Sequence, residues 1–393
     1  MTRSIVITSG VRTAIGTFSG SLAGTSPCDL GAAVATEAIA RAGIGAAEVQ
    51  QTVLGNVLHT HPEDMYISRI VAIRAGVPDT APALTLNRLC GSGLQAVVTA
   101  AEQIMLGHAE ITLAGGAENM SRAGHLLTTA RHGQKMGDSR AIDMMIGALT
   151  DPFGNGHMGV TAENIAKRYG IDRDAQDAFA LESHRRASQA IAEGRFSDQI
   201  LPMNVRQGRS EVTFDTDEHV RGDISAERLE GLRPAFTKDG SVTAGNASGI
   251  NDGAAALVLM EEDTARHKGA APLARIVAYG LGGVAPEIMG MGPVPATQQA
   301  LLRAGLNAND LDVIESNEAF AAQACAVSQE LGLDPARVNP NGGAVALGHP
   351  IGASGAIILV KLIYELQRTG GRYGLATMCI GGGQGIAVIV ERI

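Results

Sequence analysis

The chain has 393 residues, of which 45% are hydrophobic and 18% charged, so it can fill a large core and does not have the composition of a disordered protein. Its formal net charge of -9 argues against a sequence-independent nucleic-acid-binding protein, which needs a basic surface to displace counterions. The first residues lack the apolar stretch of a signal peptide, and no CxxC pair occurs among Cys28, Cys90, Cys325 and Cys379. We therefore expect a cytoplasmic protein with reduced thiols, no membrane span and no bound metal.

Strand and helix patterns alternate through the first part of the chain. Residues 30–42 and 94–106 have the apolar spacing of helices. Short apolar or β-branched runs predict strands at residues 4–8, 53–57, 83–86 and 111–114. This alternation indicates a sheet covered by helices.

Residues 118–249 differ in composition, with more charge, more His and Met, and fewer strand patterns. They predict helices at 158–171 and 174–193 and loops over about 206–232. We interpret this region as an insertion into the first half that forms a lid or a substrate-facing domain.

The last part of the chain resumes the alternation and echoes the first part. In each part a residue with reactive chemistry, Cys90 or His349, precedes a helix rich in small residues, then a strand, then a glycine run. By itself the echo leaves open whether the chain is duplicated. The predicted strands are 254–260, 274–279, 311–315 and 375–379, and the predicted helices are 296–304, 320–331 and 352–366.

The segment Asn87-Arg-Leu-Cys90-Gly-Ser-Gly93 places a cysteine between a predicted strand and the start of a predicted helix. Free N–H groups at a helix N-terminus stabilise a thiolate, and the same groups can hold the negative oxygen of a reacting carbonyl. Taken alone, however, this pattern more often marks a buried structural cysteine.

Two further glycine-rich segments contain a base and a second thiol. Gly348-His349-Pro350 carries a histidine, the usual base for a cysteine nucleophile, although a capping histidine in a turn would also fit. Cys379-Ile-Gly381 places a second cysteine at the end of a predicted strand, where it can exchange a proton; a glycine-rich turn between strands is the alternative.

Two polar segments complete the set. In Glu315-Ser-Asn317-Glu318-Ala-Phe320, Asn317 can orient a water or a histidine, but the spacing also fits a helix cap with an acidic first turn. The small polar residues from Thr243 to Gly253 are typical of a loop along a narrow ligand channel or of an ordinary surface loop. The joint occurrence of all these segments, in this order, is more specific than any one of them.

Taken together, these segments resemble the thiolase family over nearly the whole chain, and most of all its bacterial, short-chain biosynthetic type. The resemblance extends to Gly10-Val-Arg12-Thr13, to Gly115-Gly116-Ala-Glu118-Asn-Met120-Ser121 and to His157-Met158-Gly159-Val-Thr161-Ala-Glu163-Asn164. It implies a five-layer αβαβα sandwich of two similar α/β halves with an inserted loop domain. The implied division is residues 1–117 with 250–270 as the N-terminal half, 118–249 as the loop domain and 271–393 as the C-terminal half.

The resemblance also implies an acyltransferase reaction, the reversible Claisen condensation of acetyl-CoA with acetyl-CoA or a short acyl-CoA. These CoA thioesters are substrates, and no cofactor is expected. Cys90 would carry the acyl group, His349 would remove its proton and Cys379 would move the proton at the α-carbon. Asn317 and His349 would stabilise one oxyanion, and the N–H groups of Cys90 and Gly381 the other. The chemistry agrees, because carbon–carbon bond formation needs an acid or base besides the one that activates the nucleophile. A helix N-terminus and a neighbouring histidine could also lower the pKa of Cys90.

By the same resemblance, eight residues would contact CoA, with Arg221 near the nucleotide end. They are Ser248, His157, Met158, Arg221, Phe236, Ala244, Ala319 and Phe320. The expected assembly is a homotetramer, with residues 130–138 as a contact loop.

The nearest rival is a catabolic 3-ketoacyl-CoA thiolase for longer chains, which these segments barely distinguish. A ketoacyl synthase is disfavoured because Asn317 stands where that class has a second histidine. A non-catalytic CoA- or lipid-binding protein, or a structural scaffold, would have no reason to keep both Cys90 and Cys379 with His349.

Overall fold

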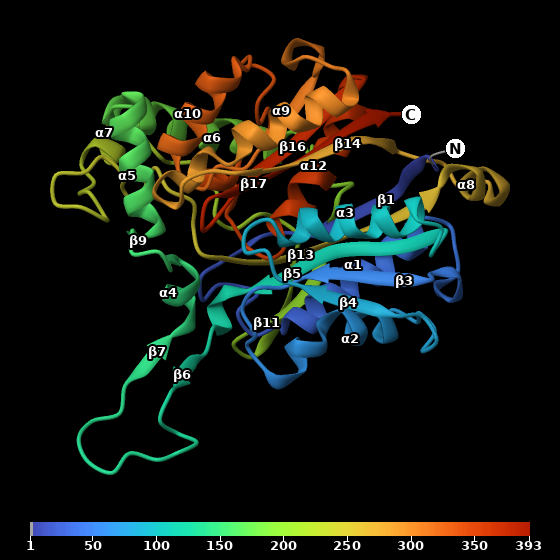
Figure 1. The fold of residues 1–393 in the computed structure, drawn as a ribbon, viewed down its shortest axis with the longest axis horizontal. Coiled ribbons are helices and arrows are strands. Elements are labelled where there is room, and N and C mark those ends of the chain that lie inside the picture. The colour runs from blue at the N-terminus through green and yellow to red at the C-terminus, as the bar shows by residue number, and fades with distance from the viewer. Residues whose placement is uncertain (1–2) are drawn as a thin grey trace.

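The first half of the chain forms a five-stranded sheet (Figure 1). The structure is a computed structural model, and it describes residues 3–393. The strand order is β4-β3-β5-β13-β1. β3 runs parallel to both of its neighbours, and β13 runs antiparallel to β5 and β1. The strands are β1 (Ile5–Thr13), β3 (Gln51–Gly55), β4 (Ala83–Leu86), β5 (Ile111–Asn119) and β13 (Asn251–Glu261).

The second half repeats this arrangement. Its strands lie in the order β15-β16-β17-β14, with β15 parallel to β16, and with β17 antiparallel to both β16 and β14. A short antiparallel pairing of β14 with β1, at Val6 with Arg275 and Ile7 with Ala274, joins the sheets of the two halves at their edges. A parallel bridge from Ile314 to Val338 takes the place of the fifth strand. The two halves share the same strand order and strand directions, which indicates that one unit is duplicated. The sequence alone left this question open. The strands are β14 (Ala274–Gly283), β15 (Val313–Ser316), β16 (Tyr373–Ile380) and β17 (Gln384–Arg392).

Helices form three layers around the two sheets, as Figure 1 shows. α1 (Pro27–Arg41) and α2 (Ile67–Arg74) cover the outer face of the first sheet, and α9 (Pro293–Ala304) covers that of the second, with α10 (Ala321–Leu331) beside it. α3 (Ser92–Met105) and α12 (Ser354–Thr369) pack against each other between the sheets. The predicted five-layer αβαβα sandwich of two similar halves is therefore confirmed.

The central strands are apolar because helices cover both of their faces. Every residue of β5 is buried, as is every residue of β13 up to Met260. In the primary sequence these strands therefore consist mainly of apolar and small residues, as in residues 254–260 (AAALVLM), without the alternation of a half-exposed strand. Polar residues within these strands are confined to a few buried positions, of which Glu118 is one.

The two central helices touch near their N-termini through glycines in matching positions. A Cβ on Gly93 would lie 2.8 Å from the backbone nitrogen of Ala356, and one on Gly355 would lie 2.3 Å from that of Leu94. Both approaches are closer than any side chain allows, so only glycine fits. This contact brings together the residues that precede α3 and α12, which include Cys90 and His349.

The region between the last residues of β5 and the first of β13 contains α5 (Met158–Tyr169) and α6 (Arg173–Ala192). The prediction of loops over residues 206–232 is wrong in part. A hairpin of β11 (Met203–Gln207) and β12 (Ser210–Phe214) and the short α7 (Ala226–Glu230) lie there. The hairpin's inward side chains, Val205 and Phe214, are buried, so packing against the rest of the molecule stabilises the hairpin. The charged residues of this segment, taken alone, favour a loop.

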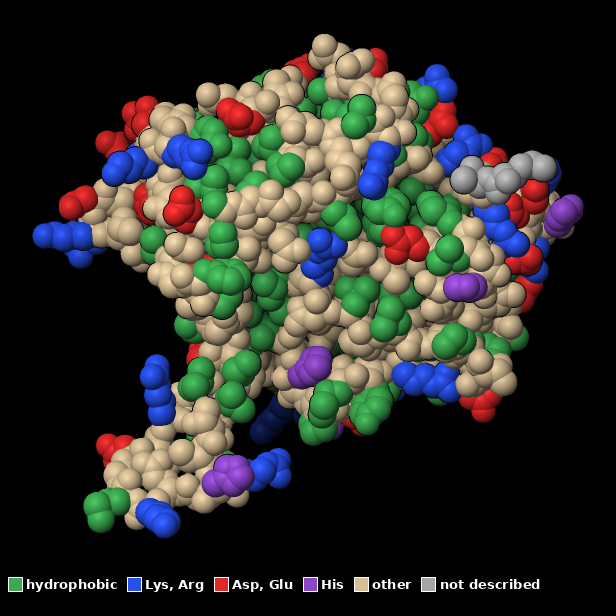
Figure 2. Space-filling model, viewed as in Figure 1, with side chains coloured by type: hydrophobic (Ala, Val, Ile, Leu, Met, Phe, Trp, Pro, Cys, Tyr) green, Lys and Arg blue, Asp and Glu red, His purple; other side chains and the backbone are tan. Residues whose placement is uncertain are grey.

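A narrow hairpin of β6 (His125–Leu127) and β7 (Ala141–Asp143) projects from the body of the molecule (Figure 1). Figure 2 shows the same projection carrying basic and histidine side chains. Leu126, Leu127 and Met136 on it are exposed, Met136 at 91%. Within residues 3–393, no helix is long and apolar enough to cross a membrane.

The remaining elements are short. They are β2 (Gly16–Thr17), α4 (Met144–Ala148), β8 (Thr150–Asp151), β9 (Gly156–His157), β10 (Ile200–Leu201), α8 (Glu262–Lys268) and α11 (Ala344–Leu347).

Candidate active site

Cys90 lies in a tight turn between β4 and α3. Leu89, the residue before it, has a left-handed φ of 46°, which is uncommon for a branched side chain. Two side chains hold the turn: Leu89 N–H donates to Asn87 Oδ1 (2.9 Å), and Ser92 Oγ donates to Leu89 O (2.7 Å). The turn leaves Cys90 partly accessible to solvent at the entrance of α3.

His349 lies in the corresponding turn before α12 and is buried. Its backbone N–H donates to Asn251 Oδ1 (2.9 Å), and its Nδ1 lies 2.7 Å from Ser354 Oγ. Its other ring nitrogen, Nε2, is buried without a protein hydrogen-bond partner. Burial lowers the pKa of His349 to about 4, so the imidazole is neutral at neutral pH.

Cys379 and Gly381 lie where β16 turns into β17, beside Cys90. The N–H of Gly381 and the N–H of Cys90 itself both face the Cys90 sulfur and act to lower its pKa. Burial raises the pKa of the Cys379 thiol, and the neighbouring Cys90 raises it further. The predicted nucleophile, second thiol and Gly381 are therefore brought together, although they come from opposite halves.

Asn317 follows β15 and joins the same region. Its backbone N–H donates to Thr377 O (2.9 Å) on β16, and its side-chain Nδ2 is buried without a protein partner. Asn317, Gly348 and Ser354 line a common cavity of about 10 Å³. The asparagine is therefore beside the histidine turn, as expected for the two to act together.

The electrostatics of Cys90 correct one expectation. The helix terminus was expected to lower its pKa, but burial outweighs the two N–H groups and raises the pKa to about 11, with a smaller contribution from Glu118. Cys90 is therefore a thiol at neutral pH. A neutral base nearby is then needed to accept its proton when a substrate arrives.

Several of the expected CoA contacts form one surface beside Cys379. Met158, Ala319 and Phe320 share an apolar cluster with Cys379, and Phe236 packs against it. The His157 ring stacks on Phe236 at 4.8 Å between centroids, and Phe236 meets Phe320 edge-on at 6.0 Å. These stacked rings form an apolar surface that leads to the thiols.

The other expected contacts lie around this surface. Ser248 N–H donates to Ala319 O (3.0 Å), which places that loop directly beside the cluster. Ala244 is exposed. Arg221 is also exposed, and its backbone N–H donates to Nδ1 of the buried His184 (3.1 Å).

The chain matches two family models, the thiolase N-terminal domain over residues 5–263 and the thiolase C-terminal domain over residues 270–392. The chain belongs to the thiolase family. It is 61% identical to the Beta-ketothiolase BktB of Cupriavidus necator and 52% identical to an acetyl-CoA acetyltransferase of Escherichia coli, and each alignment covers 100% of both chains.

Solved structures of other thiolases agree with this relationship. The acetyl-CoA acetyltransferase of Bacillus anthracis is 48% identical with a TM-score of 0.98, and the match covers 100% of this chain and 99% of that one. Human mitochondrial 3-ketoacyl-CoA thiolase in complex with CoA is 43% identical with a TM-score of 0.97, over 100% of this chain and 98% of that one. The family and fold predicted from the sequence are confirmed.

Two residues near the site of this thiolase were not singled out from the sequence. Ser354 contacts the His349 ring, and Glu118 accepts a hydrogen bond from Gly352 in the same turn. Glu118 belongs to a segment that carried the family resemblance, and Ser354 lies just beyond another, but the side-chain partners of the two are distant in sequence or hidden within a turn. Among the described residues, no group of three or more His, Cys, Asp or Glu side chains could hold a metal ion.

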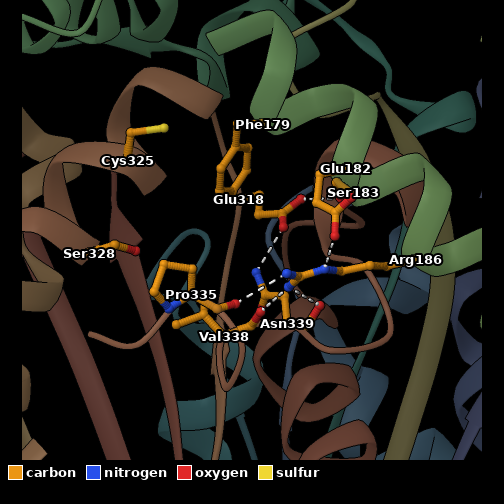
Figure 3. A pocket seen from close by; sticks show the side chains of 10 residues that line it. All are labelled: Phe179, Glu182, Ser183, Arg186, Glu318, Cys325, Ser328, Pro335, Val338 and Asn339. Atoms are coloured by element: carbon orange, nitrogen blue, oxygen red, sulfur yellow. Dashed lines mark hydrogen bonds and ion pairs between the residues drawn. The ribbon is translucent and has the colours of Figure 1, made fainter. Parts of the chain in front are cut away.

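A separate cavity of about 300 Å³ lies between α6 and α10 of this thiolase, and Glu318 is among the residues that line it (Figure 3). Its polar side chains bond to their neighbours: Glu318 accepts from Ser183 (2.7 Å) and Asn339 (2.8 Å), and Arg186 donates to Glu182 and to Val338 O. None of the predicted site residues lines it, so it is distinct from the candidate active site.

Proposed function

We propose that this thiolase catalyses the reversible Claisen condensation of acetyl-CoA with acetyl-CoA or a short acyl-CoA, through an acyl thioester on Cys90. The observation that carries the proposal is that Cys90 lies beside Cys379 and packs against the apolar cluster that includes Ile351, in the turn of the buried, neutral His349. The acetyl-CoA acetyltransferases and the β-ketothiolase named above support the short-chain assignment.

In the first half-reaction, His349 Nε2 accepts the proton of the Cys90 thiol as sulfur attacks the acyl carbon of acetyl-CoA. The negative oxygen that forms is stabilised by the N–H groups of Cys90 and Gly381. The carbon–sulfur bond to CoA then breaks, and CoA leaves with the proton from His349. The products are acetyl-Cys90 and CoA.

In the second half-reaction, Cys379 as a thiolate removes a proton from the methyl group of a second acetyl-CoA. The carbanion attacks acetyl-Cys90, and Asn317 and His349 stabilise the enolate oxygen while it forms. Cleavage of the bond to Cys90 releases acetoacetyl-CoA and leaves a Cys90 thiolate, which takes the proton from Cys379, so that the Cys90 thiol and the Cys379 thiolate are restored. Burial raises the pKa of Cys379, so its thiolate is a small fraction at neutral pH but a stronger base for this carbon acid.

We assign the pantetheine channel to the surface of stacked rings and its surroundings. His157, Met158, Phe236, Ala319 and Phe320 would contact the pantetheine arm, with Ser248 and Ala244 beside them. Arg221, exposed at the rim, would lie near the nucleotide end. Flat apolar rings suit a thin, flexible ligand because they cover it without specific polar pairing.

We further propose a cytoplasmic homotetramer built from three parts per chain, namely residues 1–117 with 250–270, residues 118–249, and residues 271–393. The projecting hairpin supports the assembly, because Leu126, Leu127 and Met136 expose apolar surface on a segment with no core of its own. Four free cysteines agree with a reducing compartment. Light scattering of the purified protein tests the tetramer, and a stable monomer would refute it.

Intact-mass measurement tests the acyl-enzyme. Mixing with acetyl-CoA should add one acetyl group to the wild-type chain, and none to Cys90→Ser on the same time scale. Cys90→Ser should fold normally and lose nearly all turnover. Unchanged turnover in this variant would refute the acyl-enzyme on Cys90.

Thiolysis rates separate the short-chain assignment from its alternative, a catabolic 3-ketoacyl-CoA thiolase for longer chains. We expect the highest kcat/KM with acetoacetyl-CoA or 3-ketovaleryl-CoA. An optimum with 3-ketooctanoyl-CoA or a longer substrate would favour the catabolic alternative.

A further inference from the structure

Glu118, at the end of β5, is a fully buried carboxylate whose role the reaction above does not use. Four N–H groups within hydrogen-bond distance point at its two oxygens. Oε1 accepts from Asn56 Nδ2 (3.2 Å) and Leu58 N (3.1 Å), and Oε2 accepts from Val57 N (3.0 Å) and Gly352 N (2.9 Å). No Lys or Arg is among these donors. A buried carboxylate without a cation is costly unless such bonds compensate it.

The arrangement fits a carboxylate better than an amide. An ionised carboxylate accepts at all of its lone pairs and donates nothing, so four converging N–H groups can all be satisfied. An amide in the same place would direct its own NH₂ group at two of those donors. Burial raises the pKa of Glu118, and the N–H groups of Leu58, Val57 and Gly352 oppose that rise. With four donors converging on the two oxygens, the geometry favours the ionised form.

The four donors belong to two segments from different halves of the molecule. Asn56, Val57 and Leu58 follow β3 in the first half, and Gly352 belongs to the His349 turn in the second. The fit is tight, because a Cβ on Gly352 would lie 2.4 Å from Glu118 Oε2. The carboxylate is therefore one of two polar links, the other being Asn251 with the His349 N–H, that hold the histidine turn against the first sheet.

Each of the two segments contacts one of the reacting groups. Leu58 and Ile351 are buried in a small apolar cluster against which Val57 and Cys90 pack. On the other side, Gly352 lies two residues before Ser354, whose hydroxyl contacts His349 Nδ1 at 2.7 Å. Glu118 thus connects the wall beside the nucleophile to the turn that carries its base.

We propose that Glu118 is a positioning residue for acyl transfer, which fixes the His349 turn relative to Cys90 by tying Gly352 to the segment after β3. The proposal rests on the proposed function. It assigns to Glu118 no contact with the substrate. Misplacement of a reacting group by about 1 Å can cost on the order of 100-fold in rate, so loss of this link should slow the chemical step.

The test compares Glu118→Gln, Glu118→Asp and a control, Asp64→Asn. Asp64 is also buried and also accepts backbone N–H bonds, from Thr60 (2.7 Å) and His61 (3.0 Å), but it does not contact Gly352. Acetyl loading of Cys90 is followed by rapid-quench intact-mass measurement, which gives the fraction of chains that load and the rate constant separately.

For Glu118→Gln we expect a rate constant about 10- to 100-fold lower, with the loaded fraction near one and KM for acetyl-CoA within about twofold of wild type. Glu118→Asp, which keeps the charge, should recover part of the rate, and Asp64→Asn should load at the wild-type rate. A merely structural role would instead lower the loaded fraction at an unchanged rate constant, and that result, or wild-type loading by Glu118→Gln, overturns the proposal.

Two features keep the outcome decisive. The rate constant is measured only on chains that load, so partial unfolding of Glu118→Gln does not hide it. If Glu118→Gln does not fold, Glu118→Asp takes its place in the test. In that case, loading of Glu118→Asp at the wild-type rate overturns the proposal. If the wild-type chain itself is not acetylated, the proposed function fails, and the positioning role, which rests on it, fails too. If the wild type loads and the variants load equally fast, only the positioning role fails.

Discussion

The hydroxyl of Ser354 lies between His349 Nδ1, at 2.7 Å, and the carbonyl oxygen of Pro350, at 2.9 Å. The hydroxyl has one proton and donates it to the carbonyl, so it must accept from Nδ1–H. This fixes the imidazole tautomer with the proton on Nδ1 and leaves Nε2 as the basic nitrogen. The unpartnered Nε2 is therefore the atom that would accept the Cys90 proton in the proposed reaction.

Replacement of Ser354 by Ala should slow acyl transfer without preventing folding. It leaves Nδ1–H buried without a partner, at a cost of about 1–3 kcal/mol, and frees the ring to change tautomer. We expect kcat to fall about 10- to 100-fold in a thiolysis assay, whereas Ser328→Ala, on α10 away from the site, should keep wild-type kcat. Equal kcat for wild type and Ser354→Ala would contradict the fixed tautomer.

Replacement of Cys379 by Ser should separate the two half-reactions. Its thiol lies beside Cys90 but is not the acyl carrier in the proposed reaction, so the variant should still be acetylated by acetyl-CoA. It should form no acetoacetyl-CoA above about 1% of the wild-type rate, because an alcohol is a far weaker acid–base group for the α-carbon. Intact-mass measurement and product chromatography check the two halves. Absence of the acetyl adduct would show that the roles are divided wrongly.

The pH dependence of acetylation should follow the lowered pKa of His349. The base is active only when neutral, and its pKa is about 4, below the ordinary value of about 6.5. The rate constant for loading should therefore be nearly constant from pH 8 down to about pH 5 and fall only below that. Circular dichroism at each pH controls for unfolding. A midpoint near pH 6.5 would mean that His349 is solvated and not buried as described.

Replacement of Gly355 by Ala should destabilise the protein strongly. The added Cβ would lie 2.3 Å from the backbone nitrogen of Leu94, which cannot move without separating α3 from α12. Overpacking of this kind costs about 1–3 kcal/mol or more in free energy of unfolding. Gly24→Ala, which would meet nothing within 4 Å, should change it by less than about 0.5 kcal/mol. Urea unfolding measures both, and similar stabilities would contradict the close helix contact.

Local patterns predicted most of the main elements. The helix predicted at 94–106 is observed at Ser92–Met105, and the strand predicted at 375–379 lies within Tyr373–Ile380. β17 and α2 were not predicted, and the β11–β12 hairpin was taken for a loop. α2 and the hairpin depend on contacts with distant segments, which a window of neighbouring residues does not contain, whereas residues 386–390 (IAVIV) of β17 are a local strand pattern that the sequence does contain.

The sequence by itself determined the residues that carry chemistry and the fold they belong to. The four predicted catalytic side chains each lie at the end of a helix or strand: Cys90, His349, Cys379 and Asn317. Glycines mark where two backbone segments approach each other. The sequence shows these features because they depend only on neighbouring residues. The tertiary structure decided where those groups lie relative to one another and which protonation state each has. Pairing of strands far apart in the chain brings the two thiols together, and the packing around them raises the pKa of both. Desolvation therefore makes Cys90 a thiol, whereas a helix terminus alone would favour its thiolate. Desolvation also keeps His349 neutral. Glu118 shows the same limit, since its four donors come from two segments that only the folded chain places side by side.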